Sequence, residues 1–273
     1  MPATSEHDYV LGTNDAEIER LRLQHGVWRA DAALAWRRVG FVPGDTILDV
    51  GCGPGFAALE LADIVGRDGR VIAIDQSRRF LDHLRAQCEA RRLSNVSTSQ
   101  HDLASYAFND VQADGAWLRW ILAFVPHPRR VLRGLADALT PGGRVAIHEY
   151  FAYESWKVVP RDPEFESFVA AVMASWRARG GEPNVGLELA SWLTAMGFQV
   201  QSTRTITEVV TRAHHRWHWP AAFALSGLER LIALGDVSPR EGDRMRARIQ
   251  ALWTDDAWMV TPGVVEVIAT KPG

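Results

Sequence analysis

The sequence has few cysteines, no long apolar run and no excess of positive charge, and each shortage excludes a class of protein. Its 273 residues include only 2 cysteines, Cys52 and Cys88, too few for a disulfide framework or a four-cysteine zinc site. No stretch approaches the roughly 20 apolar residues of a membrane-spanning helix, and residues 1–8 lack the order of a secretion signal. We therefore expect a soluble cytoplasmic protein.

Charge and apolar content narrow the kind of partner. The 30 Lys and Arg residues face 33 Asp and Glu residues, so the net charge of −3 gives no positive field for a nucleic-acid backbone. Hydrophobic residues make up 47% of the chain, which is ample for a packed core. We expect a small-molecule partner, no nucleic acid and no membrane, and a homodimer is left open.

Strand-like and helix-like segments alternate in the first half of the chain. A leading helix is predicted over Asp15–Val39, where apolar residues recur at helical spacing until Gly40. Turns at 66–69 and 140–143 separate later segments, and this alternation is typical of a parallel sheet with helices on both faces. The predicted strands are Thr46–Val50, 71–74, 96–101, 113–120 and 144–150, with helices such as Phe56–Val65 and 77–92 between them.

The rhythm changes after residue 150, where helices dominate. Seven of the 11 tryptophans also lie there. We predict helices over 162–179, 187–196, 214–234 and 239–253 and strands over 198–210 and 264–269, both at the sheet edge. The expected fold class is α/β, a Rossmann-like doubly wound and mostly parallel seven-stranded sheet with a helical lid. Residues 1–44 form an N-terminal helical cap, 45–150 the ligand-binding core, and 151–273 the lid and last two strands of the same domain.

The densest motif is Ile47-Leu-Asp-Val-Gly-Cys-Gly-Pro-Gly-Phe56, an apolar strand followed by glycines at alternate positions and a helix. Glycine allows the backbone to approach a ligand closely, and a helix start offers unpaired N–H groups, so a nucleotide-type ligand is indicated. Residues 53–58 also match the dinucleotide pattern G-x-G-x-x-A, and Asp75 follows Gly55 by 20 residues, where such sites place a ribose-binding acid. The pattern alone leaves a nicotinamide cofactor open.

Three acidic residues at strand ends help to decide between a nicotinamide dinucleotide and a positively charged cofactor. Asp49 would repel a pyrophosphate but suits a positively charged ammonium. Asp49, Asp75 and Asp102 follow one another at intervals of 26 and 27 residues, one strand–helix unit each. The carboxyl ends of parallel strands line one crevice, where Asp75 can accept both ribose hydroxyls and Asp102 an adenine amino group.

With these residues in place, the sequence resembles the class I S-adenosylmethionine-dependent methyltransferases that act on small molecules. The resemblance is carried by residues 48–55, 74–75, 101–103, 119–128 and 139–145, and it is strong over 45–150. It implies S-adenosylmethionine as cofactor, with Arg119 near the methionine carboxylate and the acceptor. The other cofactor contacts that it implies are Gly51, Cys52, Gly53 and Gly55 for methionine, Asp75 for ribose, and Gln76, Asp102 and Leu103 for adenine.

The resemblance extends more loosely to both sides of this core. Residues 9–24 look like the N-terminal segment that closes over the cofactor in small-molecule enzymes, which implies contacts from Tyr9 and Gln24. The Asn-Pro-Pro-Tyr motif of adenine and glutamine methylation is absent after the fourth strand, which reads Leu118-Arg-Trp-Ile121. No Pro-Cys pair supports cytosine methylation, so a polynucleotide acceptor is disfavoured.

Methyl transfer requires alignment of donor and acceptor, and a dedicated base is optional. His148 and Glu149 end the fifth predicted strand at the expected crevice rim and are the candidates, either or neither, with His148 preferred for its pKa near neutrality. Aromatic residues of the lid suggest an apolar or aromatic acceptor. The predicted substrate pocket contains Trp120, Tyr150, Trp156 and Trp217.

No metal site is predicted. His214 and His218 would share a helix face, but no acidic or cysteine motif accompanies them. The leading hypothesis is an enzyme that transfers a methyl group from S-adenosylmethionine to an oxygen, nitrogen or carbon of a small metabolite. The alternatives are an NAD(P)-dependent oxidoreductase and a cofactor-binding protein without transfer activity.

Overall fold

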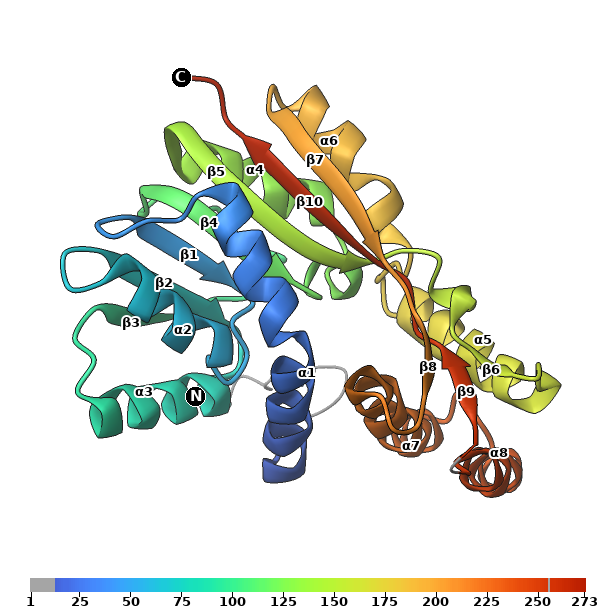
Figure 1. Cartoon of the computed structure of the whole chain (residues 1–273). Coiled ribbons are helices and arrows are strands. Elements are labelled where there is room, and N and C mark those ends of the chain that lie inside the picture. Colours follow the sequence, from blue (N-terminus) through green and yellow to red (C-terminus); the bar gives the residue numbers. More distant parts are fainter. Residues whose placement is uncertain (1–12, 255) are drawn as a thin grey trace, which may run out of the picture.

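The computed structural model describes residues 13–254 and 256–273, which build a seven-stranded sheet flanked by helices (Figure 1). The strand order is β3-β2-β1-β4-β5-β10-β7. The strands of this sheet are β1 Thr46–Val50, β2 Arg70–Asp75, β3 Val96–Gln100, β4 Ala113–Arg119, β5 Leu139–Tyr150, β7 Gln199–Ile206 and β10 Val264–Thr270.

The first five strands run parallel, and β10 pairs antiparallel with both β5 and β7. The chain winds from β1 outward to β3 and then returns to place β4 on the other side of β1. This reversal opens a crevice at the carboxyl ends of β1 and β4, where ligands bind in such sheets. The predicted fold class, a mostly parallel seven-stranded doubly wound sheet, is confirmed.

Helices cover both faces of the sheet (Figure 1). One face carries α1 (Asp15–Val39), α2 (Phe56–Val65) and α3 (Arg78–Arg91), and the other carries α4 (Pro128–Ala138) and α6 (Leu189–Ala195). Helix α1 begins where the Asn14 side chain accepts a hydrogen bond from the Glu17 N–H, and it ends at Gly40 with a φ of 81°. Its Trp36 packs edge-on against Trp117 of β4, which anchors the helix to the sheet.

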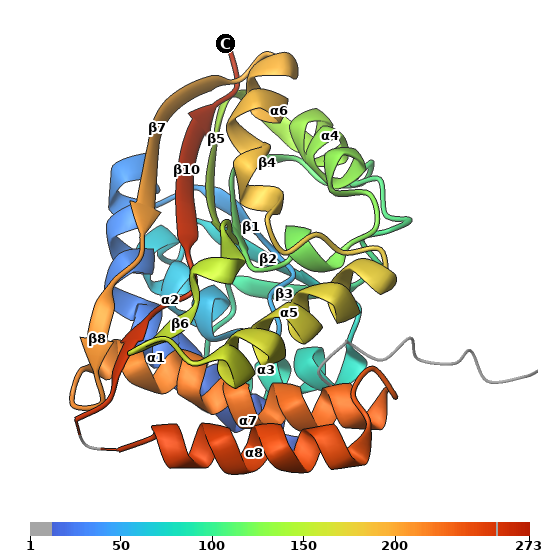
Figure 2. The same ribbon diagram turned by 90° about the vertical axis from the view of Figure 1, so that its right-hand side faces the viewer.

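Three helices of the segment after residue 150 lie across the carboxyl ends of the parallel strands (Figures 1 and 2). They are α5 (Pro163–Ala178), α7 (His218–Ala233) and α8 (Pro239–Leu252). Short 3-10 turns occur in this segment at Tyr153–Ser155, Val185–Leu187 and His215–Trp217, and another, Leu122–Phe124, follows β4. Within residues 13–254 and 256–273, no helix combines the length and the apolar character needed to cross a bilayer.

Two strand predictions need correction. The predicted strand 198–210 is divided, since β7 ends at Ile206 and Val209–Thr211 forms β8 in a second sheet of order β6-β9-β8, with β6 at Lys157–Val159 and β9 at Trp258–Val260. Strands of three residues are too short to show a period of two. The predicted turn at 140–143 lies inside β5 as an irregularity, where the register with β4 shifts between Ala113 and Gly115.

Candidate functional site

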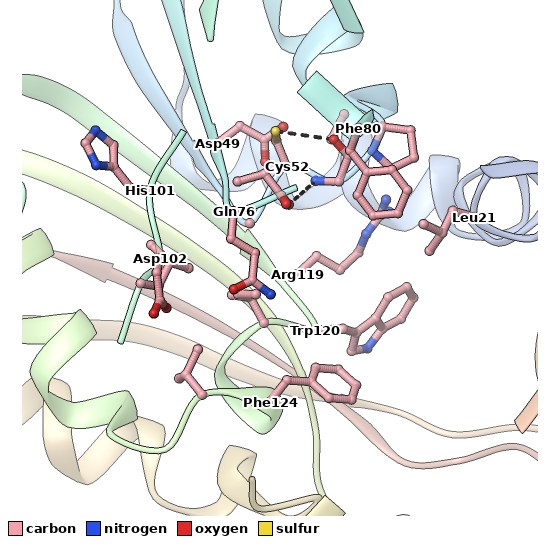
Figure 3. A pocket seen from close by; sticks show the side chains of 18 of the residues that line it. Leu21, Asp49, Cys52, Gln76, Phe80, His101, Asp102, Arg119, Trp120 and Phe124 are labelled. Atoms are coloured by element: carbon pink, nitrogen blue, oxygen red, sulfur yellow. Dashed lines mark hydrogen bonds between the residues drawn. The ribbon is translucent and has the colours of Figure 1, made fainter. Parts of the chain in front are cut away.

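A pocket of about 440 Å³ opens at the carboxyl ends of the central strands. Figure 3 shows His101 and Asp102 at one end and Leu21 at the other, with Asp49 and Cys52 on one wall and Trp120 and Phe124 on the opposite wall. The pocket lining contains ten of the twelve residues that sequence reasoning assigned to the cofactor: Gln24, Asp49, Gly51, Cys52, Gly53, Asp75, Gln76, Asp102, Leu103 and Arg119.

The glycine loop between β1 and α2 forms the floor of the pocket. The N–H groups of Gly51 and Cys52 both donate to the Ile74 carbonyl, at 2.8 and 2.9 Å. Gly51 and Gly53 have φ values of 72° and 54°, which L side chains rarely adopt. A Cβ on Gly51 would lie 2.6 Å from Ile121 Cγ1, whereas a Cβ on Gly53 would meet nothing within 4 Å. The loop therefore depends on glycine for two separate reasons.

Alanine substitutions should separate these reasons. Gly51→Ala combines backbone strain with a steric clash and is expected to lower the free energy of unfolding by about 3 kcal/mol. Gly53→Ala adds only backbone strain and should cost about 1 kcal/mol. Urea unfolding of both variants and of the wild type measures the difference; equal losses would show that packing against Ile121 contributes nothing.

Asp75 ends β2 and organises the loop. One carboxylate oxygen accepts the Gly53 N–H and the other accepts the Ser77 N–H, both at 2.8 Å. Burial raises the pKa of this carboxyl, and the backbone hydrogen bonds partly oppose the shift. Each oxygen has a further lone pair, so the group can also accept hydroxyl donors from a ligand.

Asp49 and Arg119 are the oppositely charged pair of the pocket. Burial raises the pKa of Asp49 to about 7, against the influence of Arg119, and burial lowers the pKa of Arg119 to about 10, so the guanidinium stays charged at neutral pH. Asp49 Oδ2 and Arg119 Nη1 are both buried without a hydrogen-bond partner among the described residues. Buried polar atoms are rarely unpaired, so these two fit a ligand that carries an ammonium and a carboxylate.

The opposite end of the pocket is polar and more exposed. Asp102 Oδ1 accepts the Ala104 N–H at 2.9 Å, and the His101 ring stacks on Tyr106 at 3.8 Å. Leu103 is buried beside them and adds an apolar surface for a flat ring. Burial raises the pKa of the Cys52 thiol well above the ordinary value, which favours the neutral thiol over the nucleophilic thiolate.

The remaining wall is apolar and comes from the segment after β4. Trp120 has a φ of 51°, and its N–H donates to the His148 carbonyl at 3.0 Å. Its ring lies nearly parallel to the rings of Tyr150 and Trp219, with centroids 5.5 and 5.4 Å away, and those two rings are also stacked, 6.3 Å from each other. We used this segment for the family resemblance. We did not predict from the sequence that Ile121, Phe124, Val125 and Pro126 line the pocket.

His148 does not lie at the pocket rim, contrary to the prediction of a base. Its side chain is fully buried and does not line the pocket, and its Nε2 lies 3.0 Å from Glu266 Oε2. Glu266 also accepts from Arg204 at 3.0 Å and pairs with Arg38. The reason is that β10 pairs with β5 and places Glu266 directly opposite His148, so the histidine belongs to a buried charge network.

Glu149 does not line the pocket either. Strand alternation turns its side chain to the face of the sheet opposite that of His148, where backbone N–H groups occupy the carboxylate. It accepts the N–H groups of Leu122 at 2.8 Å, Ala123 at 3.3 Å and Tyr150 at 2.9 Å, and burial raises the pKa of this carboxyl to about 7. Glu149 thus fixes the 3-10 turn that carries Phe124 into the pocket.

Three of the four predicted substrate residues lie behind the pocket wall. Trp156 is fully buried, and its Nε1 donates to Met259 Sδ at 3.2 Å. Trp217 packs against Trp253, and Tyr150 supports Trp120 from behind. These rings fill the core under the helices that follow residue 150, and only Trp120 lines the pocket.

The other predictions concern the N-terminal segment and metals. Gln24 is nearly buried in α1 and lines the pocket, while Tyr9 lies outside the described residues. Across residues 13–254 and 256–273, no group of three or more His, Cys, Asp or Glu side chains could hold a metal ion. His214 precedes the turn that leads into α7, so it does not share a helix face with His218.

Comparison with known proteins gives the same picture. Residues 47–143 match the model of the methyltransferase domain family. The chain is 31% identical over 146 residues to the 2-phytyl-1,4-naphtoquinone methyltransferase of Trichormus variabilis, covering 53% of this chain and 59% of the relative. Over this part, the chain is similar to the S-adenosylmethionine-dependent methyltransferases. This similarity supports the predicted cofactor, S-adenosylmethionine.

A second curated relative is similar in sequence, and a solved structure is similar in fold. The demethylmenaquinone methyltransferase of Lactococcus lactis is 31% identical over 126 residues, covering 46% of this chain and 49% of that protein. The solved structure of a coclaurine N-methyltransferase has a TM-score of 0.56 and 18% identity, covering 89% of this chain and 72% of that one. The chain spans about half to three fifths of the length of these curated relatives.

Proposed function

We propose that the protein transfers a methyl group from S-adenosylmethionine to a small apolar or aromatic acceptor. One observation carries the proposal. Asp49 Oδ2 and Arg119 Nη1 are both buried without a hydrogen-bond partner among the described residues, and both side chains line the same pocket as Asp75 and Asp102. A zwitterionic amino-acid group would satisfy both orphan atoms, whereas a pyrophosphate would meet the Asp49 carboxylate.

The pocket residues divide between the parts of the cofactor. Arg119 donates to the methionine carboxylate and Asp49 accepts from its ammonium, while the backbone at Gly51 and Gly53 leaves room for the chain between them. Asp75 accepts the ribose hydroxyls, and the adenine end is formed by Gln76, Asp102 and Leu103. When bound, S-adenosylmethionine supplies a methyl group on a positively charged sulfur.

The acceptor end is formed by apolar side chains. Leu21 of α1 and the segment 120–126 enclose it, and the stacked Trp120 ring gives one flat surface. Such a surface favours a ring or another apolar group and excludes water from the reacting atoms. Two of the relatives are named as methyltransferases of quinones, which are flat ring compounds, and this is consistent with the proposed acceptor class.

We also propose that, among the described residues, no side chain at the acceptor end of the pocket acts as a dedicated general base. Neither His148 nor Glu149 lines the pocket, and His101, which does, lies with Asp102 at the end of the pocket away from Leu21 (Figure 3). The protein then acts by alignment and exclusion of water, and the acceptor supplies a reactive carbon, nitrogen or acidic hydroxyl of its own.

A transfer assay tests the proposal. Purified protein with methyl-labelled S-adenosylmethionine should label reduced naphthoquinones and substituted phenols and should leave glycine and polar sugars unlabelled. The Asp75→Ala variant serves as the control for contaminating activity. Labelling of only the polar compounds would contradict the acceptor class. Tight cofactor binding without transfer to any acceptor would favour a binding protein without transfer activity.

The affinity for the amino-acid part should depend on pH through Asp49. Its pKa of about 7 lies above the ordinary value, so the group is mostly protonated at pH 6.0 and mostly ionised at pH 7.5. Because the ammonium requires the ionised form, affinity for S-adenosylhomocysteine should rise about eightfold over this interval. Asp49→Asn should flatten the profile, and 5′-methylthioadenosine, which lacks the amino acid, should show no rise in wild type. A rise of equal size with that ligand would place the titrating group elsewhere.

Other predictions extend the proposal. A polynucleotide is not an acceptor, the location is the cytoplasm, and residues 151–273 comprise helical lid insertions and the last two sheet strands, in the same domain as the core. A homodimer is the assembly to be tested against a monomer. Light scattering of the purified protein measures the assembly; a monomer at all concentrations would remove the homodimer.

A further inference from the structure

His25 joins the pocket to helices on its rim. It lies in α1, and its Nδ1 is 2.9 Å from Arg119 Nη2 at the end of β4. Its Nε2 lies 3.2 Å from Glu60 Oε1 in α2, and Arg29 Nε reaches the same Glu60 oxygen at 2.7 Å. Three elements that surround the pocket thus meet at one imidazole ring.

The partners of the ring assign its tautomer. Arg119 can only donate, so His25 Nδ1 must accept, and the ring proton is on Nε2, which faces Glu60. Burial lowers the pKa of His25, and Glu60 only partly opposes this shift, so the ring is neutral at neutral pH and keeps its acceptor. A second cation beside Arg119 is thereby avoided.

This contact leaves one end of the guanidinium for a ligand. Nη2 is held by His25, while Nη1 is buried and without a partner among the described residues. The guanidinium carbon also lies 5.2 Å from the centroid of the Trp120 ring. A long, flexible side chain is therefore fixed before the ligand arrives, which lowers the entropic cost of binding.

We propose that His25 is a positioning residue, which holds Arg119 so that Nη1 faces the carboxylate of the cofactor; this inference rests on the proposed role of Arg119. His25 makes no contact with the cofactor in this account and acts through Arg119 alone. Its effect should therefore be confined to ligands that carry the carboxylate.

Calorimetric titration with S-adenosylhomocysteine and with 5′-methylthioadenosine tests the inference on the full chain. His25→Leu removes the acceptor and should weaken S-adenosylhomocysteine binding about tenfold while leaving 5′-methylthioadenosine unchanged. His25→Asn places an amide oxygen near the position of Nδ1 and should restore affinity to within about threefold of wild type. His83→Leu is the matched control, since His83 also packs against the Phe56 ring at 5.9 Å but lies on α3, and it should change neither affinity.

A double substitution separates the possible outcomes. In an Arg119→Met background, His25→Leu should cause no further loss of S-adenosylhomocysteine affinity, because His25 acts on binding only through Arg119. Equal weakening of both ligands by His25→Leu, or a full additional loss in the Arg119→Met background, would overturn the inference. If Arg119→Met itself leaves S-adenosylhomocysteine binding intact, the placement of the carboxylate has failed, and with it the premise of the role of His25.

Discussion

Replacement of Asp75 by alanine is expected to weaken S-adenosylhomocysteine binding at least a hundredfold, the largest effect of any single substitution in the pocket. The carboxylate would accept both ribose hydroxyls, and hydrogen bonds to a charged group contribute about 1.5–3 kcal/mol each. The same group holds the N–H groups of Gly53 and Ser77, so the variant also loosens the glycine loop. Isothermal titration calorimetry measures the affinity.

The matched control for this substitution is Asp114→Ala. Asp114 also lies in a strand of the sheet and accepts a backbone N–H, that of Thr46 at 2.8 Å, but it does not line the pocket. Asp75→Ala loses two backbone anchors and Asp114→Ala loses one, each of about 1–3 kcal/mol, and thermal unfolding compares the two losses. Only Asp75→Ala should lose affinity; similar affinity losses in the two folded variants would show that loosening of the fold, and not a ribose contact, is responsible.

Arg119→Met is expected to weaken S-adenosylhomocysteine binding about fiftyfold to a hundredfold. The substitution removes a buried charge-assisted hydrogen bond to the carboxylate, about 1.5–3 kcal/mol, and it also raises the pKa of Asp49 further, because Arg119 holds that pKa down. Methionine keeps much of the apolar stem that packs beside Trp117 and Trp120. Calorimetry at pH 7.5 gives the change in affinity.

Two comparisons make the Arg119 result specific. Binding of 5′-methylthioadenosine, which has neither carboxylate nor ammonium, should change less than twofold. Arg119→Lys keeps the positive charge but cannot reach the carboxylate and His25 together, so an intermediate loss of about tenfold is expected. A variant that lost affinity for both ligands to the same extent would indicate collapse of the pocket and would contradict the assignment.

In residues 46–120, the order of strands, turns and helices along the sequence was enough to predict most of the cofactor pocket. The glycine loop and the acids Asp49, Asp75 and Asp102 were predictable, because strand, tight turn and helix follow one another in sequence and bring strand ends to one crevice. Ten of twelve predicted cofactor residues line the pocket, Gly55 packs instead against Leu84 of α3, and Tyr9 is not described. Their contacts with the cofactor stay predictions until binding is measured.

The second half of the chain was less predictable because its contacts are long-range. His148 was expected at the rim from its place at a strand end, yet the antiparallel pairing of β10 with β5 puts Glu266 opposite it and buries both. The sequence around His148 contains no signal that predicts a contact with Glu266, which lies 118 residues away. The tryptophans were misassigned for a related reason, since Trp156 and Trp217 meet core aromatics from α5 and from the segment after α8.

The link from His25 to Arg119 belongs to the same class of unpredictable contacts. The two residues lie 94 positions apart, and a lone histidine inside a helix gives no local signal of a partner. Only the packing of α1 across the carboxyl ends of the strands brings the ring to the guanidinium.

We propose above that the glycine-loop pocket recognises S-adenosylmethionine through its ribose and its zwitterionic end. Calorimetric titration of the purified, cofactor-stripped protein with S-adenosylhomocysteine and with NAD, under the same conditions, tests it most directly. We expect saturable one-to-one binding of S-adenosylhomocysteine and no binding of NAD, because Asp49 opposes a pyrophosphate. Binding of NAD in the absence of any S-adenosylhomocysteine binding would contradict it.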